Sequence, residues 1–259
     1  MLHYKTYEHP TSSEWVTFIH GAGGSSSIWF KQIREYKSHF NVLLLDLRGH
    51  GQSKSHKVNI FKRYTFESIT KDVLEVLDHL KLKQSHFVGI SLGTIIIREL
   101  AELAPSKVKS MVMGGAIMKM NFRSQILMKL GIWFKSVIPY ILLYRFFAWV
   151  IMPRKKHKES RNLFIREAKK LYQKEFIRWF RLASEVNPLL RFFREKDLRI
   201  PTLYIMGDED YMFLPSIKKI AAKHKKSELH IVNDCGHVVN VDQPKEFNQV
   251  TIDYIHNQS

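Results

Sequence analysis

Short apolar runs alternate with longer stretches of helical period along most of this 259-residue chain. Between the second and third runs, residues 66–80 repeat Ile69, Val73 and Val76 at the spacing of one helix face. The alternation predicts an α/β fold with a mostly parallel, doubly wound sheet, whose strands are apolar throughout because helices cover both faces. The expected strands lie in WVTFIH, FNVLLLDL, SHFVGI, VKSMVMGG, PTLYIMG and ELHIVN.

Basic residues are concentrated in one segment of the chain, whose overall formal charge is +17. From Ile117 to Lys196 there are 19 Lys and Arg against 5 Asp and Glu, whereas the remainder has 22 against 19. A shift this sharp indicates an insertion with a character of its own. We therefore expect residues 1–116 and 197–259 to form two parts of one core, with 117–196 inserted between them.

The pentapeptide GISLG, residues 89–93, lies between an expected strand and an expected helix. In this context G-x-S-x-G is the sequence of a nucleophile elbow, a tight turn that lifts a serine above the sheet. Gly89 and Gly93 lack Cβ atoms, so the strand and the helix can approach closely. The free N–H groups at the helix N-terminus stabilise negative charge at the same place. Ser91 is therefore the predicted nucleophile.

A serine nucleophile needs a base and an acid that orients the base. After a nucleophile elbow the expected chain order is Ser, then Asp or Glu, then His, each following a strand. Two later strands are followed by GDEDYMFLP and NDCGHVVNVDQP. The candidates are Asp208 and Asp210 for the acid and His237 for the base.

With these residues the chain resembles the α/β-hydrolase superfamily at five ordered stretches, which span nearly all of it outside the basic segment. They are HGAGG at 20–24, DLRGHGQS at 46–53, GISLG at 89–93, GDEDYMFLP at 207–215 and GHVVNVDQPKEF at 236–247. The similarity is to the bacterial branch that holds small esterases, lactonases and carbon–carbon hydrolases. It implies an α/β-hydrolase fold in which residues 117–196 form an inserted helical cap.

The resemblance also implies roles for single residues. In similar family members the acid lies three residues after the glycine, which favours Asp210 over Asp208, and the histidine of the final G-H pair is His237. The oxyanion hole is then formed by the backbone N–H groups of Ala22 and Leu92.

Four further residues are expected to serve packing and support. His20 and His50 resemble structural, hydrogen-bonding positions of the family, and Cys235 is read as a small buried filler. Thr94 departs from the family, because many relatives carry another glycine there, so packing behind the elbow is expected to differ. A serine in place of an aspartate nucleophile argues against the chemistry of haloalkane dehalogenases and epoxide hydrolases.

The sequence predicts neither a cofactor nor a metal. The glycine-rich stretch HGAGG lacks the G-K-[ST] ending of a P-loop and the G-x-G-x-x-G spacing of a dinucleotide site, and no metalloprotease spacing occurs. No nucleic-acid recognition motif accompanies the positive charge, so no nucleic-acid partner is expected. A single cysteine and an N-terminal stretch without an apolar signal core favour a cytoplasmic location.

The segment 117–196 begins aromatic and aliphatic and then turns strongly basic. Pro139 and Arg145 interrupt its apolar part, so a transmembrane helix is not expected. One hypothesis is a lid whose apolar side favours small apolar acyl or aryl substrates. The other is peripheral contact with an anionic membrane. It would use Trp133, Phe134, Tyr140, Tyr144, Phe146, Phe147 and Trp149 together with Arg154, Lys155, Lys156 and Lys158.

Three functions remain open at this point. The first is a serine hydrolase that cleaves carboxylic esters through an acyl-enzyme. The second is a hydrolase of the same fold that acts on a lactone, a thioester or a carbon–carbon bond. The third is a weakly catalytic signalling protein that binds a small molecule. The sequence does not separate them, because function depends on the pocket and not on the fold.

Overall fold

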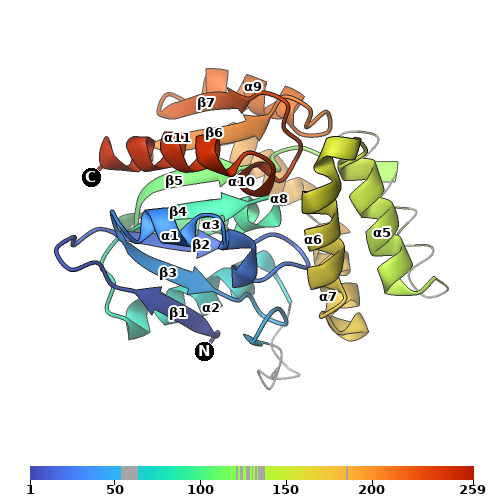
Figure 1. Cartoon of the computed structure of the whole chain (residues 1–259), viewed down its shortest axis with the longest axis horizontal. Helices are drawn as coiled ribbons and strands as arrows, with labels where there is room; N and C mark the ends of the chain where they lie inside the picture. The colour runs from blue at the N-terminus through green and yellow to red at the C-terminus, as the bar shows by residue number, and fades with distance from the viewer. Residues whose placement is uncertain are drawn as a thin grey trace.

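The computed structural model describes residues 1–53, 64–120, 122, 125–126, 129, 131, 133, 138–184 and 186–259. These residues form a seven-stranded sheet with the order β1-β3-β2-β4-β5-β6-β7 (Figure 1). The strands are β1 (Tyr4–Tyr7), β2 (Trp15–Ile19), β3 (Asn41–Leu45), β4 (Ser85–Ile90), β5 (Val108–Gly114), β6 (Thr202–Gly207) and β7 (Ser227–Val232). Neighbouring strands are parallel except for β1 and β3, which are antiparallel. The predicted mostly parallel sheet is confirmed.

Helices cover both faces of the sheet. The first face packs against α2 (Phe66–His79), α3 (Leu92–Leu103) and α9 (Leu214–Lys223), and the second against α1 (Ile33–Tyr36), α10 (Val239–Asp242) and α11 (Pro244–His256). Leu43 and Leu45 of β3 point into the first apolar core. Val42 and Leu44, between and beside them, point into the second. Because successive side chains alternate between two buried faces, β3 is apolar at every position from Val42 to Leu45.

Further helices lie between β5 and β6, within the segment expected to form the cap. They are α5 (Tyr140–Ile151), η4 (Lys155–His157), α6 (Lys158–Ala168), α7 (Gln173–Ser184) and α8 (Asn187–Glu195). In Figure 1, α5, α6 and α7 lie beside the end of the sheet toward which the arrows of β3 and β4 point. No helix in the described ranges is both long enough and apolar enough to cross a membrane.

Within the described ranges, β1 is a strand that the apolar runs do not reveal. β1 has the sequence YKTY and, among the described strands, pairs only with β3, so it lies at the edge of the sheet. Half of such a strand faces solvent or the periphery, and it needs no continuous apolar run. Short polar edge strands of this kind are not visible from hydrophobic patterning alone.

Candidate active site

Ser91 lies in a sharp turn between β4 and α3. Its φ of 54° is in the left-handed region, which residues other than glycine rarely adopt. The flanking glycines permit this turn. A Cβ atom on Gly93 would lie 2.3 Å from the carbonyl oxygen of Ile19, and that oxygen belongs to the backbone of β2. The predicted close approach of helix and strand is therefore present at the residue expected to bear the nucleophile.

Ser91, His237 and Asp210 form a continuous hydrogen-bonded chain. Ser91 Oγ lies 2.8 Å from His237 Nε2, and the Nδ1–H of His237 donates to Asp210 Oδ2 at 2.7 Å. Both His237 and Asp210 are buried. Asp208 is exposed, and its Oδ1 accepts from the Cys235 N–H at 3.1 Å. The fold thus brings Ser91, Asp210 and His237 together, and Asp208 takes no part in their hydrogen bonds.

The three linked residues come from different strands. Ser91 follows β4, Asp210 lies in the loop after β6, and His237 lies in the loop after β7. β6 and β7 are parallel neighbours and β5 lies between β4 and β6, parallel to both, so the carboxyl ends of the three strands lie at the same end of the sheet. Ligand sites of parallel α/β sheets lie at this end.

Backbone N–H groups are available in front of Ser91. Leu92 is the first residue of α3, where an α-helix offers no internal acceptor to the N–H. Ala22, Leu92 and Ser91 line the same cavity. The arrangement suits the expected oxyanion hole, which remains a prediction because it concerns a reaction intermediate.

Two buried histidines hold the loop after β2 in place. His20 Nε2 accepts from the Leu47 N–H at 2.9 Å, so its Nδ1–H donates to the Gly21 carbonyl at 2.8 Å. Burial lowers the pKa of His20, which keeps this ring neutral. His50 Nε2 accepts from the Gly23 N–H at 3.0 Å. These contacts fit the supporting roles expected for both histidines.

An apolar cavity of about 180 Å³ opens beside Ser91. The core contributes residues such as Leu92 and Ile95, and the expected cap contributes Tyr144, Phe147, Leu163, Phe176 and Phe180. Side-chain polar groups are few, and they include Ser91, His237, Ser160 and Glu167. A cavity with an apolar wall and a small number of polar groups suits a small apolar ligand. Among the described residues, no group of three or more His, Cys, Asp or Glu could hold a metal ion.

Comparison with known proteins decides the family. A family profile with the description "alpha/beta hydrolase fold" matches residues 14–244 of this chain. The chain belongs to the alpha/beta hydrolase fold family. The family and the fold class expected from the sequence are confirmed, and the relatives support a hydrolase of this fold.

Two relatives illustrate the range of similar sequences. The 3-oxoadipate enol-lactonase 1 of Acinetobacter baylyi is 23% identical over 93% of this chain and 88% of its own length. A putative carbamate hydrolase of Stutzerimonas stutzeri is 27% identical over 92% of this chain and 90% of its own.

Solved structures share the fold of this α/β hydrolase. A hydrolase from Oleispira antarctica superimposes with a TM-score of 0.86 at 18% identity, over 98% of this chain and 94% of that one. A thermophilic esterase from Thermogutta terrifontis superimposes with a TM-score of 0.81 at 18% identity, over 99% and 93% of the two chains.

Thr94 forms hydrogen bonds behind the elbow, and Cys235 is a buried thiol. In this α/β hydrolase the Thr94 hydroxyl donates to the Ser91 carbonyl at 2.6 Å and accepts from the Ile117 N–H at 3.3 Å. The departure from glycine therefore ties the elbow to the first residue of the inserted segment. Cys235 is fully buried, and burial raises the pKa of its thiol, so it carries no reactive thiolate at neutral pH.

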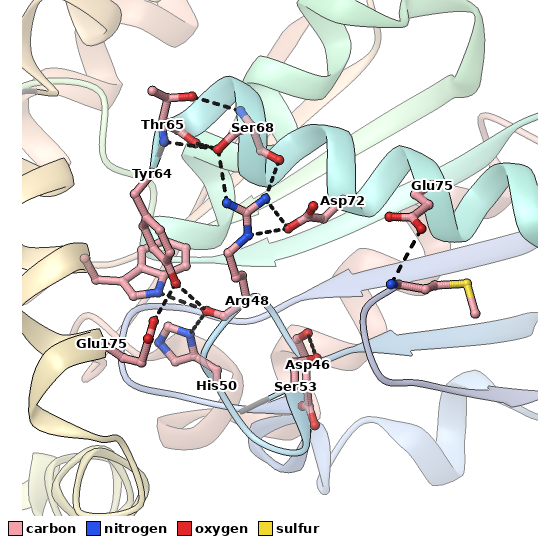
Figure 2. Close-up of polar contacts among 12 residues, drawn as sticks. Asp46, Arg48, His50, Ser53, Tyr64, Thr65, Ser68, Asp72, Glu75 and Glu175 are labelled. Atoms are coloured by element: carbon pink, nitrogen blue, oxygen red, sulfur yellow. Dashed lines mark hydrogen bonds and ion pairs between the residues drawn. The ribbon is translucent and has the colours of Figure 1, made fainter. Parts of the chain in front are cut away.

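Contacts between the inserted segment and the core include a buried network around Arg48 (Figure 2). Arg48 Nη2 forms an ion pair with Asp72 at 2.6 Å, and its carbonyl accepts from the Trp179 indole N–H at 3.0 Å. Tyr64 donates its hydroxyl to Glu175 Oε2 at 2.7 Å. Trp179 and Glu175 lie on α7, so this helix is held against the loop after β3.

Two more buried carboxylates join the inserted segment to the core. Glu167 of α6 accepts from the Ser25 hydroxyl at 2.9 Å. Glu209, in the loop after β6, lies 2.8 Å from His157 Nε2. The sequence analysis missed Glu167, Glu175, Glu209 and His157. An acid beside Lys or Arg in a basic segment gives no sign of burial, because charged runs are usually solvated.

The aromatic and basic residues of the membrane hypothesis separate into groups. Tyr144 and Phe147 are buried and line the cavity, whereas Trp133, Phe146 and Trp149 are exposed. Tyr140 is half-buried, and Phe134 lies outside the described residues. Arg154 and Lys156 form ion pairs with Glu209, while Lys155 and Lys158 are exposed.

Proposed function

We propose that the protein is a serine hydrolase that cleaves carboxylic esters of small apolar acyl or aryl substrates. The observation that carries this proposal is the chain from Ser91 Oγ through His237 to Asp210, which opens into an apolar cavity. A hydroxyl, an imidazole and a buried carboxylate in this order can perform acyl transfer. The cavity adds a place for an apolar group next to the hydroxyl.

In the first half of the reaction, His237 Nε2 accepts the proton of the Ser91 hydroxyl while Oγ attacks the ester carbonyl carbon. The carbonyl oxygen becomes an oxyanion, which the N–H groups of Ala22 and Leu92 stabilise. Asp210 holds the His237 ring in the tautomer with Nδ1 protonated and stabilises the imidazolium. His237 then protonates the leaving alcohol, and the acyl group remains on Ser91.

In the second half, water takes the place of the alcohol. His237 accepts a proton from water as the water oxygen attacks the acyl carbon, and the same two N–H groups stabilise the second oxyanion. Collapse breaks the bond to Ser91 Oγ, to which His237 returns the proton. The acid leaves and the free serine is restored.

The domain organisation belongs to the same proposal. Residues 1–116 and 197–259 would form the hydrolase core, and residues 117–196 a helical cap that closes the cavity. Support comes from the cap side chains on the cavity wall, such as Tyr144, Phe147 and Phe180. The +14 net charge of this segment would then lie on its outer side.

Alternatives within the same fold differ in the bond that is cleaved. The relatives include proteins whose names give an enol-lactone and a carbamate as substrates, which supports lactones and related acyl compounds as a second class. The same serine chain would open a lactone without releasing a separate alcohol. A weakly catalytic protein that binds a small molecule for signalling would keep the cavity and lack turnover.

A fluorophosphonate probe with peptide mass spectrometry tests the nucleophile. We expect one adduct on Ser91 and none on the Ser91→Ala variant. A panel of p-nitrophenyl esters, aliphatic lactones and thioesters then separates the substrate classes by kcat/KM. Labelling of Ser91 without turnover of any class would favour the signalling function, and equal labelling of the Ser91→Ala variant would reject Ser91 as the nucleophile.

A second proposal concerns the exposed side of α5. Leu142, Phe146 and Trp149 are exposed, whereas Leu143 and Phe147 on the opposite side are buried. A helix that is apolar on both sides has one side available for another apolar medium. With the exposed Lys155 and Lys158 nearby in sequence, this side would dock reversibly on an anionic membrane surface.

A further inference from the structure

Glu167 is an ionisable group at the wall of a mostly apolar cavity. It lies on α6, and its side chain is only 3% exposed. It lines the cavity beside Ser91 together with apolar neighbours of the same helix, Leu163 and Phe164. The site geometry described above does not use it for the reaction.

The Glu167 carboxylate is held in its charged form. Its Oε2 accepts from the Ser25 hydroxyl at 2.9 Å, and its Oε1 forms ion pairs with Lys170 Nζ at 2.7 Å and with Arg166 Nε at 3.7 Å. These hydrogen bonds outweigh burial and lower the pKa of Glu167, so the group is ionised at neutral pH. Lys170 is 53% and Arg166 67% exposed, and water screens their charges far more than that of the buried carboxylate.

Glu167 is negatively charged, whereas the cap as a whole is strongly basic. The segment from Ile117 to Lys196 has 19 Lys and Arg and only 5 Asp and Glu. Even so, the described residues that line the cavity include no lysine and no arginine, and Glu167 is the acid among them. Lys170 and Arg166 pair with Glu167 but do not line the cavity, so the basic residues of the cap present no cation to a ligand on the described part of the cavity wall.

We infer that Glu167 is a specificity-determining residue that makes the active site select neutral substrates and reject those carrying a carboxylate on the acyl group. The inference rests on the proposed function and names the substrate class of that site. A substrate carboxylate in the cavity would lose its hydration without gaining a cationic partner. It would also be repelled by the carboxylate of Glu167 in a medium of low dielectric constant. A neutral chain of the same length incurs neither cost.

Three matched substrates test this selection. They are p-nitrophenyl hexanoate, the mono-p-nitrophenyl ester of adipic acid, and the mixed methyl p-nitrophenyl ester of adipic acid. The acid replaces the terminal methyl group of the hexanoyl chain by a carboxylate, and the methyl ester controls for its added size. We expect kcat/KM of the wild type for the acid to be about 100-fold lower than for the methyl ester.

Variants then assign the effect to Glu167. Glu167→Gln should reduce the ratio of neutral to anionic substrate by about 10-fold, and Glu167→Asp, which keeps the charge, should retain most of it. Glu175→Gln is the matched control, because Glu175 is a buried cap carboxylate that is not among the residues lining the cavity. It should leave the ratio at the wild-type value. A loss of packing would lower kcat/KM for all three substrates and leave their ratio unchanged.

Several results would overturn the inference. Equal wild-type kcat/KM for the acid and the methyl ester would reject selection by charge while leaving the ester hydrolase proposal intact. An unchanged ratio in a folded Glu167→Gln variant that still labels at Ser91 would reject Glu167 as its cause. Failure of the wild type to hydrolyse any ester would instead reject the proposed function, and the inference with it.

Discussion

His157 Nε2 lies 2.8 Å from Oε2 of Glu209, and both side chains are buried. Glu209 directly precedes Asp210, and Lys156 adds a second contact to Glu209 Oε1 at 2.5 Å. The His157 ring also packs against Gly236, where an added Cβ would lie 2.8 Å from Nε2. One side chain of the proposed cap therefore touches both loops that carry the partners of Ser91.

Removal of the Glu209 carboxylate is expected to destabilise the fold. The Glu209→Ala variant leaves the buried His157 Nε2 without its hydrogen-bond partner and removes the ion pairs with Arg154 and Lys156, which should lower the free energy of unfolding by about 3 kcal/mol. Because the same loop carries Asp210, kcat should fall as well. Urea denaturation followed by circular dichroism, together with kcat for the best ester of the panel, measures both effects.

Glu159→Ala is the matched control for this variant. Glu159 of α6 pairs with Lys31 of the core at 2.8 Å, but its side chain is 60% exposed. Exposed pairs contribute little, so we expect a loss below about 1 kcal/mol and an unchanged kcat. Equal losses in the two variants would mean that burial of the Glu209 pair has no special effect on stability.

Asp210 and Asp208 should differ strongly in their effect on turnover. Asp210→Asn removes the carboxylate that accepts from His237 Nδ1–H, so kcat should fall by about 10,000-fold. Asp208→Asn changes an exposed side chain that contacts the Cys235 N–H, and kcat should stay within about 3-fold of the wild type. Steady-state kinetics of both variants on one ester decide the matter. If kcat instead falls strongly in Asp208→Asn and not in Asp210→Asn, Asp208 is the acid that orients His237.

Gly93→Ala should be far more damaging than Gly24→Ala. A Cβ at residue 93 would lie 2.3 Å from the backbone oxygen of Ile19, so α3 would have to move away from the sheet. We expect a loss of about 3 kcal/mol or more in unfolding free energy. At Gly24 the nearest atom to an added Cβ is 3.2 Å away, which needs only a small shift and about 1 kcal/mol. Thermal and urea denaturation of the two variants would show the difference, and similar stabilities would contradict the packing argument.

Much of the core was predictable because it depends on local patterns. Each of the six apolar runs contains a strand, and the helix expected at 66–80 is present as α2 at Phe66–His79. The elbow was predictable for the same reason, since Gly89, Ser91 and Gly93 lie within five consecutive residues. β1 was missed because a four-residue edge strand buries too little to need an apolar run.

The contacts between the proposed cap and the core could not be predicted from the sequence. Glu167 and Glu175 lie in helices rich in Lys and Arg, and no local pattern distinguishes them from the exposed Glu159. Their burial depends on Ser25 and Tyr64, which are more than 100 residues away along the chain. His157 likewise sits within a basic run that reads as a solvated surface, and yet its side chain is 1% exposed.

A buried histidine far from Ser91 should make stability depend on pH. His86 of β4 contacts Ser110 Oγ at 2.7 Å and Glu14 Oε2 at 3.2 Å, while Lys109 pairs with Glu14. Burial lowers the pKa of His86 to about 4, below its ordinary value of 6.5. Between these values the unfolded chain binds a proton that the folded chain does not, so stability falls as pH decreases from 6.5 to 4.

The expected loss over that window is about 2 to 3 kcal/mol. His86→Gln should remove this part of the pH dependence and leave the rest of the profile in place. Urea denaturation of both proteins at several values of pH provides the measurement. Parallel stability profiles for wild type and variant from pH 7 to pH 4 would mean that His86 titrates alike in the folded and unfolded chains.

Flotation with liposomes tests the proposed docking of the exposed α5 side. Lys155 and Lys158 should each contribute about 1 kcal/mol toward an anionic surface at low salt, and Leu142 and Phe146 should add apolar contact. We expect binding to anionic liposomes that weakens as salt increases, with little binding to neutral ones.

Two variants distinguish binding through the exposed α5 side from nonspecific binding to liposomes. The quadruple variant with Lys155→Gln, Lys158→Gln, Leu142→Ser and Phe146→Ser should stay unbound at all salt concentrations. Phe30→Ser is the control, because Phe30 is 50% exposed on the core rather than on α5. It should float as the wild type does, since the core has little net charge to attract an anionic surface. If the wild type remains unbound with both kinds of liposome, the cap serves the cavity alone, and its basic residues contribute only to solubility.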